Sequence, residues 1–192
     1  MDWCVELGVP NVSIWIGSTE NLSKRPKKEV IELYKVYQNF LGKWEEKESI
    51  LDKFEINVRF VGDLKKLPSP LVKLMGKIMQ KTAKYQKKFL NILVNYGGKS
   101  ELVEVIKTIA VKAVEAGKIE ITEKDVDKNL HVKTPVDLVL RTGGFSRLSN
   151  FMLWQTAYSE MYVTKTYLPD FSKQEFMRAI KWFSSTQRNF GK

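Results

Sequence analysis

The strongest constraint on the fold is a regular alternation of short strand-like runs with longer helical segments. Runs rich in β-branched and aromatic residues predict four strands, at Asn11–Gly17, Glu55–Val61, Phe89–Asn95 and Val136–Leu140. Apolar residues at helical spacing predict helices elsewhere, at Pro26–Phe54, Ser69–Lys88, Lys99–Ala116, Asn150–Tyr158 and Lys173–Gln187. Such alternation predicts an α/β fold with a mostly parallel central sheet and helices on both faces.

The length and the linkers predict one domain. The chain has 192 residues, enough to bury a core of its own. No internal repeat or low-complexity linker divides it. The polar stretch Gly117–Thr134 is rich in lysine and aspartate, and we expect it to be a surface excursion rather than a domain boundary. We therefore expect residues 1–192 to form a single domain.

The composition excludes several classes of protein. No apolar run approaches the roughly 20 residues of a membrane span, and the first residues lack the basic segment and cleavage site of a signal peptide. Cys4 is the only cysteine and His131 the only histidine, which excludes an internal disulfide and makes a Ser-His-Asp triad improbable. We expect a cytoplasmic protein, with peripheral contact to a membrane as a further option.

The net charge of +10 indicates acidic partners. Nucleic acid, anionic lipid head groups and phosphorylated small molecules all fit this charge, and so does a solvated surface that is simply rich in lysine. The lysines are not interleaved with aromatic residues, and no helix-turn-helix, RNP or zinc-finger pattern occurs. We therefore expect no nucleic-acid partner, and keep a basic nucleic-acid-binding module as a distant alternative.

Polar or glycine-rich segments follow all four predicted strands, at Ser18–Asn21, Gly62–Asp63, Tyr96–Gly98 and Arg141–Gly144. Ligands of open α/β sheets bind beyond the carboxyl ends of the strands. The periodicity alone therefore predicts a binding site at this edge, without naming a reaction.

The segment after the fourth strand holds the parts of a diphosphate site. Arg141 leaves the strand, and Gly143–Gly144 lets the backbone turn and approach a ligand closely. Arg147 follows, and Ser149 or Asn150 is expected to cap a helix whose free N–H groups attract an anion. Guanidinium groups, a hydroxyl and a helix N-terminus are suited to holding linked phosphates.

Each of these residues also has an ordinary structural explanation. Isolated arginines and serines more often serve the fold than a phosphate, and the apolar spacing after Asn150 more often indicates core. Glu160 is suited to Mg²⁺, which takes one or two carboxylates and fills its remaining positions with phosphate oxygens and water. A lone carboxylate is, however, more often a surface or capping group.

Five motifs, in order, resemble one family. The segment RTGGFSRLSNFMLWQTAYSE, which ends at Glu160, resembles the C-terminal signature of the cis-prenyltransferases, the undecaprenyl and dehydrodolichyl diphosphate synthase family. The other matching segments span nearly the whole chain and read STEN followed by RP, VGDLKKLP, LNILVNYGGKSELV, and LPDFSKQEFMRAIKWFSSTQRNFG. One motif alone would be weak, but five in order are specific.

The resemblance implies an enzyme and its partners. It implies cis-prenyl chain elongation, in which isopentenyl diphosphate is condensed onto an allylic diphosphate primer. The product would be a long-chain polyprenyl diphosphate, the precursor of a glycosyl carrier lipid, which associates with a membrane. The implied cofactor is Mg²⁺ and the implied assembly is a homodimer, with the neighbouring subunit close to Arg188–Gly191.

The resemblance also implies roles for residues of the signature. Arg141, Arg147 and Ser149 would bind the diphosphate of isopentenyl diphosphate. Glu160 would help to coordinate Mg²⁺.

A second set of substrate-binding residues follows the first strand, at Ser18, Thr19, Glu20, Asn21, Leu22 and Arg25. The resemblance makes Asn21 the residue that assists proton removal. One extra residue separates Asn21 from Arg25 here, so Lys24 is an alternative for the family arginine. Leu22 stands where many members have an aromatic residue.

The growing hydrocarbon requires an apolar tunnel. Apolar residues of the two long predicted helices fit its wall and fit ordinary core packing equally well: Leu33, Tyr37, Phe40, Leu74, Ile78 and Met79.

The chain departs from the family at its start. Met1–Gly8 resembles the end of the family's second helix, and the DGNxR loop, whose aspartate is central to catalysis, does not occur. We expect the chain to lack the first β-loop-α unit, either as a fragment or as an accessory subunit of a heteromeric enzyme. We expect this chain alone to be weak or inactive.

Overall fold

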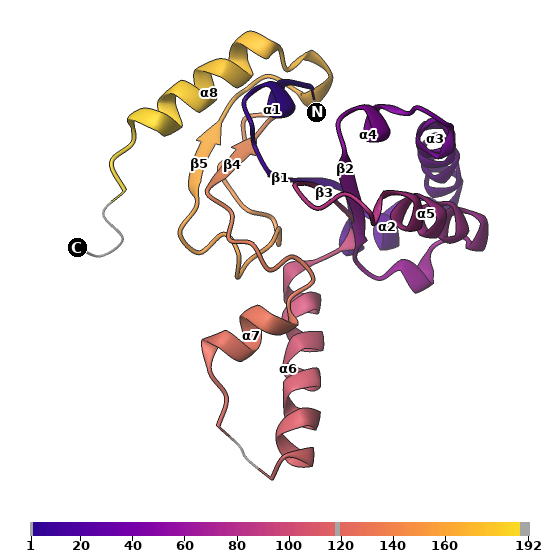
Figure 1. Cartoon of the computed structure of the whole chain (residues 1–192), viewed down its shortest axis with the longest axis vertical. Coiled ribbons are helices and arrows are strands. Elements are labelled where there is room, and N and C mark those ends of the chain that lie inside the picture. The colour runs from indigo at the N-terminus through magenta and orange to yellow at the C-terminus, as the bar shows by residue number, and fades with distance from the viewer. Residues whose placement is uncertain (1, 118–119, 189–192) are drawn as a thin grey trace. The chain divides into compact units, whose positions relative to one another are not determined.

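The computed structural model describes residues 2–117 and 120–188, and these form two compact units, Met1–Glu101 and Leu102–Lys192. Figure 1 shows their elements. The expectation of one domain over residues 1–192 stays a prediction.

The first unit is built on a parallel three-stranded ladder. β3 (Lys88–Tyr96) lies between β1 (Asn11–Ser18) and β2 (Ile56–Val61). Both neighbours run parallel to it, and Ile92 of β3 faces Ile14 on one side and Phe60 on the other. The three predicted strands are thus confirmed to within one residue at each end, and the apolar runs of β2 and β3 are buried as expected, whereas β1 is only partly buried.

Helices surround this ladder in the first unit: α1 (Asp2–Glu6), α2 (Thr19–Lys24), α3 (Lys27–Glu45), α4 (Ile50–Lys53) and α5 (Ser69–Thr82), with a 3₁₀ turn at Leu64–Lys66. α3 and α5 pack against each other, and α5 packs against β2. The core between them includes the fully buried Leu51, Met75 and Ile78.

The predicted helix Pro26–Phe54 is wrong in its second half. α3 ends at Glu45, Glu48 has a left-handed φ of 59°, and α4 begins after a capping box formed by Ser49 and Asp52. The Lys81 ammonium stabilises the turn between α3 and α4, because it donates to carbonyls of this turn and lies 2.6 Å from the Asp52 carboxylate.

The predicted helix Ser69–Lys88 also ends early, at Thr82. The hydroxyl of Thr82 donates to the Ile78 carbonyl and accepts from the Val58 amide at 3.1 Å. The side chain thereby ties the end of α5 to β2.

The second unit contains a parallel pair of strands, β4 (Leu138–Arg141) and β5 (Glu160–Val163). Its helices are α7 (Glu123–Asn129) and α8 (Lys173–Ser185), with a 3₁₀ turn at Leu168–Asp170, and α6 (Gly98–Glu115) leads into it from the first unit. A small core of Val105, Ile109 and Leu130 lies on α6 and at the end of α7.

Two predictions for the second unit are wrong or incomplete. The predicted helix Asn150–Tyr158 is a series of turns and bends. Ser149, Asn150 and Met152 have positive φ angles of 53°, 71° and 36°, which a right-handed helix excludes. The stretch expected to be a surface excursion contains α7, and β5 had not been predicted.

Among the described residues, none of the helices has both the length and the apolar character needed to cross a bilayer.

Candidate functional site

A cavity of about 390 Å³ lies in the first unit at the carboxyl ends of the strands. Its lining comes from α2, α3, the 3₁₀ turn and β3: Thr19, Glu20, Leu22, Ser23, Tyr34, Lys66 and Asn95. Thr19, Glu20 and Leu22 are therefore brought together around one cavity, and their substrate roles stay predictions. Such a partly apolar concave site with a few polar groups is typical of small-molecule binding.

The other predicted residues of this segment do not line the cavity. Ser18 is buried, and its Oγ caps α2 by accepting from the Asn21 amide at 2.9 Å. Asn21 and Arg25 have exposed side chains, and the Arg25 amide donates to the Asn21 carbonyl at the end of α2. The structure therefore gives Ser18 a structural role, and the substrate roles of Ser18, Asn21 and Arg25 stay predictions.

The floor of this edge depends on Gly62 and Asn95. Gly62 has a φ of 131°, and a Cβ there would lie 2.0 Å from the Val94 carbonyl oxygen. Asn95 is left-handed, and its Nδ2 donates to the Asp63 carbonyl at 2.9 Å. The Asp63 carboxylate in turn lies 2.9 Å from the Lys66 ammonium. Backbone and side chains at this edge thus fix one another before any ligand arrives.

Tyr37 anchors α3 to β1 below this edge. Its hydroxyl donates to the Ile16 carbonyl at 2.5 Å, and burial raises its pKa to about 12, so it stays protonated at neutral pH. Gly17 leaves room beside it, since a Cβ there would lie 3.5 Å from the Tyr37 hydroxyl oxygen.

The residues named as candidates for a tunnel wall are mostly core. Tyr37 and Ile78 are buried in the main core, and Leu33, Leu74 and Met79 pack against it. Phe40 is 55% exposed, with its ring edge-on to Trp44 at a centroid distance of 5.0 Å. A tunnel wall at these positions stays a prediction.

In the second unit, Arg141 is the last residue of β4. Its Nε is buried, and no hydrogen-bond partner for it exists within residues 2–117 and 120–188. A buried donor left unpaired costs on the order of 1–3 kcal/mol, and a water molecule or a ligand oxygen is an acceptor that would pair with it. A phosphate oxygen is an acceptor that a guanidinium binds well.

The backbone after Arg141 turns back over the strand end. Gly143 and Gly144 have φ angles of 84° and 79°, a left-handed region where side chains are strained. Their amides donate to the carbonyls of Thr166 and Thr164 at 3.0 and 2.8 Å. The glycine loop is thereby fixed against the segment that follows β5.

Arg147 lies further along this loop, with its guanidinium carbon 4.2 Å from the centroid of the Phe145 ring. Both side chains are exposed. Ser149 is exposed too, on a left-handed backbone. The expectation that Ser149 or Asn150 caps a helix is wrong, because no helix begins there, and the expected anion site on helical N–H groups is lost with it.

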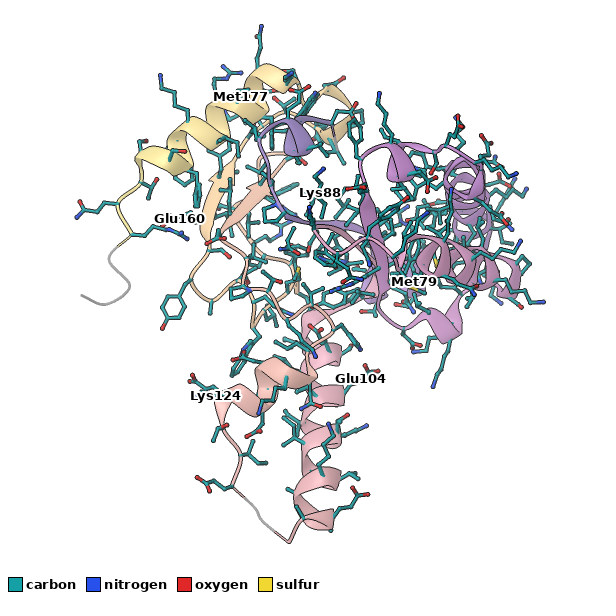
Figure 2. The ribbon with its side chains drawn as sticks, in the orientation of Figure 1. Met79, Lys88, Glu104, Lys124, Glu160 and Met177 are labelled. Atoms are coloured by element: carbon teal, nitrogen blue, oxygen red, sulfur yellow. The ribbon has the colours of Figure 1, made fainter. Side chains whose placement is uncertain are left out.

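Glu160 begins β5, where its amide donates to the Asp137 carbonyl at 2.9 Å. Figure 2 labels its side chain, which is partly exposed. Within the described ranges, no group of three or more His, Cys, Asp or Glu side chains is placed to hold a metal ion.

The sequence reasoning missed several residues at these sites. Tyr34, Lys66 and Asn95 line the first cavity, although the rule about strand ends already pointed to the segments after β2 and β3. Thr164 and Thr166 support the glycine loop, but nothing in the chain marked them because β5 itself had not been predicted.

Comparison with known proteins identifies the family. The prenyltransferase family model described as undecaprenyl diphosphate synthase matches residues 1–191. The chain belongs to the undecaprenyl diphosphate synthase family. The motif-based resemblance is thereby confirmed.

Relatives and solved structures agree with this membership. An isoprenyl transferase of Aquifex pyrophilus is 38% identical over 194 residues, covering 100% of this chain and 80% of the relative. A tritrans,polycis-undecaprenyl-diphosphate synthase (geranylgeranyl-diphosphate specific) of Methanocaldococcus jannaschii is 37% identical, covering 99% of this chain and 69% of the relative.

Among solved structures, a probable undecaprenyl diphosphate synthase of Campylobacter jejuni has a TM-score of 0.88 at 34% identity. It is covered to 88%, and this chain to 100%. Lavandulyl diphosphate synthase of Lavandula x intermedia, in complex with dimethylallyl diphosphate, has a TM-score of 0.89 at 30% identity over 100% of this chain and 83% of that one. The predicted α/β fold with a parallel sheet is confirmed.

Membership in the undecaprenyl diphosphate synthase family makes the protein a prenyltransferase by family. The relatives carry transferase or synthase names, which gives the accessory-subunit and nucleic-acid-binding alternatives no support. The predicted tail that includes Asn189–Gly191 lies outside the described residues.

Proposed function

We propose that the protein carries out cis-prenyl chain elongation, condensing isopentenyl diphosphate onto an allylic prenyl diphosphate to make a long-chain polyprenyl diphosphate. The family and the names of its relatives support this reaction class. The product would serve as a precursor of a glycosyl carrier lipid.

The observation that carries the proposal is the buried Arg141 Nε at the end of β4, which has no acceptor among the described residues. The glycine loop follows directly after it in the chain, and Arg147 adds a second guanidinium further along this loop, over the Phe145 ring. Two guanidinium groups beside a close-approaching backbone suit a diphosphate better than a single phosphate or a carboxylate.

In this proposal Arg141, Arg147 and Ser149 hold the diphosphate of isopentenyl diphosphate. Fixing that end of the substrate positions its double bond for attack on the allylic carbon, and positioning of this kind is worth several kcal/mol of the barrier. The carbon–carbon bond forms as the allylic carbon–oxygen bond breaks, and the allylic diphosphate leaves with the electron pair. Arginine side chains stabilise that departing charge.

The segment after β1 also binds substrate in this proposal. Thr19, Glu20 and Leu22 contact substrate from the wall of the first cavity, with Ser18 holding the start of α2. The exposed Asn21 assists removal of the proton that the condensed product loses, the departed diphosphate takes up that proton, and Arg25 adds a positive charge.

The donor set fits Mg²⁺ only if the substrate supplies most of the ligands. Glu160 is a single partly exposed carboxylate, and Mg²⁺ in phosphate sites uses one or two carboxylates plus phosphate oxygens and water. A bound Mg²⁺ would neutralise charge on the departing diphosphate. Glu160 would hold it, while Arg141 and Arg147 stay bound to the diphosphate of isopentenyl diphosphate.

The proposal is tested by isothermal titration calorimetry of the chain with isopentenyl diphosphate and Mg²⁺. We expect saturable binding that Arg141→Met removes, while Lys124→Met, which removes one positive charge from α7 (Figure 2), leaves it unchanged. A labelled-substrate assay with an allylic primer then reports elongation. Unchanged binding by Arg141→Met would overturn the assignment of the site.

We also propose that the protein is a homodimer, because α6 carries an uncovered apolar stripe. Val103, Ile106, Ala110 and Val114 recur at helical spacing on it, and the three larger side chains are 50%, 61% and 79% exposed. The opposite polar face makes a matched control possible. Ile106→Glu should shift the sedimentation equilibrium toward monomer, whereas Thr108→Glu should not.

The long apolar product would leave for a membrane, so we propose a cytoplasmic protein that meets the membrane surface when it releases product. Co-flotation with vesicles in the presence and absence of product tests this.

A further inference from the structure

The loop that carries the diphosphate site rests on three residues just after β5. The Thr164 amide donates to the Arg141 carbonyl at 2.9 Å, which extends the pairing of β4 and β5 by one step. The Gly144 and Gly143 amides then donate to the carbonyls of Thr164 and Thr166 at 2.8 and 3.0 Å. The position of residues 164–166 therefore determines the path of the loop backbone.

One carboxylate holds this segment in place. Glu175, in the first turn of α8, accepts at Oε1 from the hydroxyl of Thr166 at 2.5 Å and from that of Thr164 at 3.2 Å. The Thr166 amide donates to the Thr164 hydroxyl at 3.3 Å, so both threonine side chains are engaged. The bond from Thr166 is in the range of a charge-assisted O–H···O⁻ bond, and it holds the pKa of Glu175 below its ordinary value.

The same carboxylate also caps its own helix. Its Oε2 accepts from the Ser172 amide at 3.3 Å, while the Ser172 Oγ accepts from the Glu175 amide at 3.2 Å. A capping box of this kind needs only one carboxylate oxygen. The second oxygen, Oε1, accepts from the hydroxyls of the two threonines, and the carbonyls of the same threonines accept from the amides of the glycine loop.

We propose that Glu175 is a positioning residue for isopentenyl diphosphate: through Thr164 and Thr166 it fixes the glycine loop and thereby the Arg141 guanidinium. The inference rests on the proposed function, since it assigns a support to that same site. Glu175 touches neither Arg141 nor the loop itself, and it acts through the two threonines. Preorganised binding groups need such a support, because a displacement of about 1 Å can cost up to roughly 100-fold.

The experiment compares four variants of the full chain by calorimetry with isopentenyl diphosphate. Thr164→Val removes the hydroxyl at nearly constant shape, and we expect it to weaken binding roughly tenfold. Thr164→Ser returns the hydroxyl and should restore binding. Glu175→Ala should weaken binding at least as much as Thr164→Val, whereas Ser172→Ala removes only the helix cap and should lower the melting temperature without changing the affinity.

Amide hydrogen exchange shows whether the loss of the Glu175 contacts loosens the glycine loop itself. In the ligand-free chain we expect faster exchange at Gly143 and Gly144 in Glu175→Ala and Thr164→Val, and unchanged exchange there in Ser172→Ala. If Glu175→Ala fails to fold, the comparison of Thr164→Val with Thr164→Ser tests the positioning role by itself.

The outcomes separate this inference from the proposed function. Absent binding by the unsubstituted chain, or unchanged binding by Arg141→Met, would sink the proposed function. If Arg141→Met abolishes binding but Thr164→Val binds as tightly as the unsubstituted chain, only the positioning role is overturned. Equal weakening by Ser172→Ala would likewise overturn it, because the helix cap would then explain the effect.

Discussion

The strand ends of the two units differ in how their polar groups are paired. In the first unit the groups at the strand ends bind one another: Ser18 caps α2, Asn95 bonds the Asp63 carbonyl, and Asp63 pairs with Lys66. In the second unit Arg141 keeps a buried nitrogen without an acceptor among the described residues. The first edge is therefore shaped before a ligand arrives, whereas the proposed function has a ligand complete the second.

This contrast has an energetic side. A satisfied polar network adds stability and rigidity, while an unsatisfied buried group costs stability that ligand binding can return. Substitutions in the first unit should therefore change the free energy of unfolding, and substitutions at the second site should mainly change affinity.

Glycine substitutions give the largest expected effect. Gly62→Ala should destabilise the chain by about 3 kcal/mol or more, since its Cβ would overlap the Val94 carbonyl at an unfavourable φ. Gly143→Ala has more room, with the Tyr167 ring 3.5 Å away, and should cost roughly 1–2 kcal/mol for its left-handed backbone. Urea unfolding measures both. Equal losses would contradict the contrast, and Gly76→Ala, in open space on α5, is the control.

The next largest effect separates affinity from stability. Arg141→Met keeps the apolar stem of the side chain but removes the buried unpaired donor. We expect affinity for isopentenyl diphosphate to fall by about 100-fold, while the free energy of unfolding stays equal or rises. Calorimetry and urea unfolding on the same preparation check this, and a clear loss of stability would show that Arg141 serves the fold.

The third effect is a pH dependence that comes from Asp52 in the first unit. Burial would raise the pKa of Asp52, but hydrogen bonds from Lys81, Ser49 and Tyr85 outweigh it and lower the pKa from 3.8 to about 2. The folded pKa lies below the unfolded one, so the stabilisation is present above about pH 4 and is lost as the pH falls toward 2.

This stabilisation is about 2 kcal/mol, because the pKa falls from 3.8 to about 2 and each pKa unit corresponds to about 1.4 kcal/mol. The Asp52 side chain is only 19% exposed, so solvent screens its interactions weakly. Urea unfolding between pH 5 and 2 should show the loss in the unsubstituted chain and a flatter profile in Asp52→Asn. A profile that Asp52→Asn leaves unchanged would assign the acid sensitivity elsewhere.

The same contrast explains what the sequence could predict. The strands of the first unit follow from apolar β-forming runs, and β3, buried on both sides, was bounded to within one residue. The predictions that failed were those in which one local sequence pattern was compatible with two structures, a helix or an irregular segment. Phe151, Trp154 and Tyr158 have helical spacing, yet Tyr158 is 77% exposed and the Trp154 Nε1 donates to Asp127 on α7.

Local signals could have improved some of these predictions and not others. The capping-box pattern of Thr122 and Asp125 predicts a helix start within the polar stretch, where α7 begins. By contrast, the left-handed Ser149, Asn150 and Met152 carry no residue type that demands a positive φ. Their conformation depends on the rest of the folded chain, so the loop geometry was not predictable, and the substrate roles of the residues on this loop stay predictions.

The smallest expected effects come from two serines that were both predicted to bind substrate. Ser18→Ala should cost about 1 kcal/mol of stability through the lost cap of α2, with its effect on affinity limited to that local loosening. Ser149→Gly should gain several tenths of a kcal/mol, because glycine tolerates the φ of 53°, but should weaken isopentenyl diphosphate binding several-fold. Ser149→Ala separates the two causes, since it removes the hydroxyl and keeps the strain: its affinity should match Ser149→Gly and its stability the unsubstituted chain. If Ser149→Ala binds normally, the hydroxyl has no part in holding the diphosphate, and the second site consists of the arginines and the glycine loop alone.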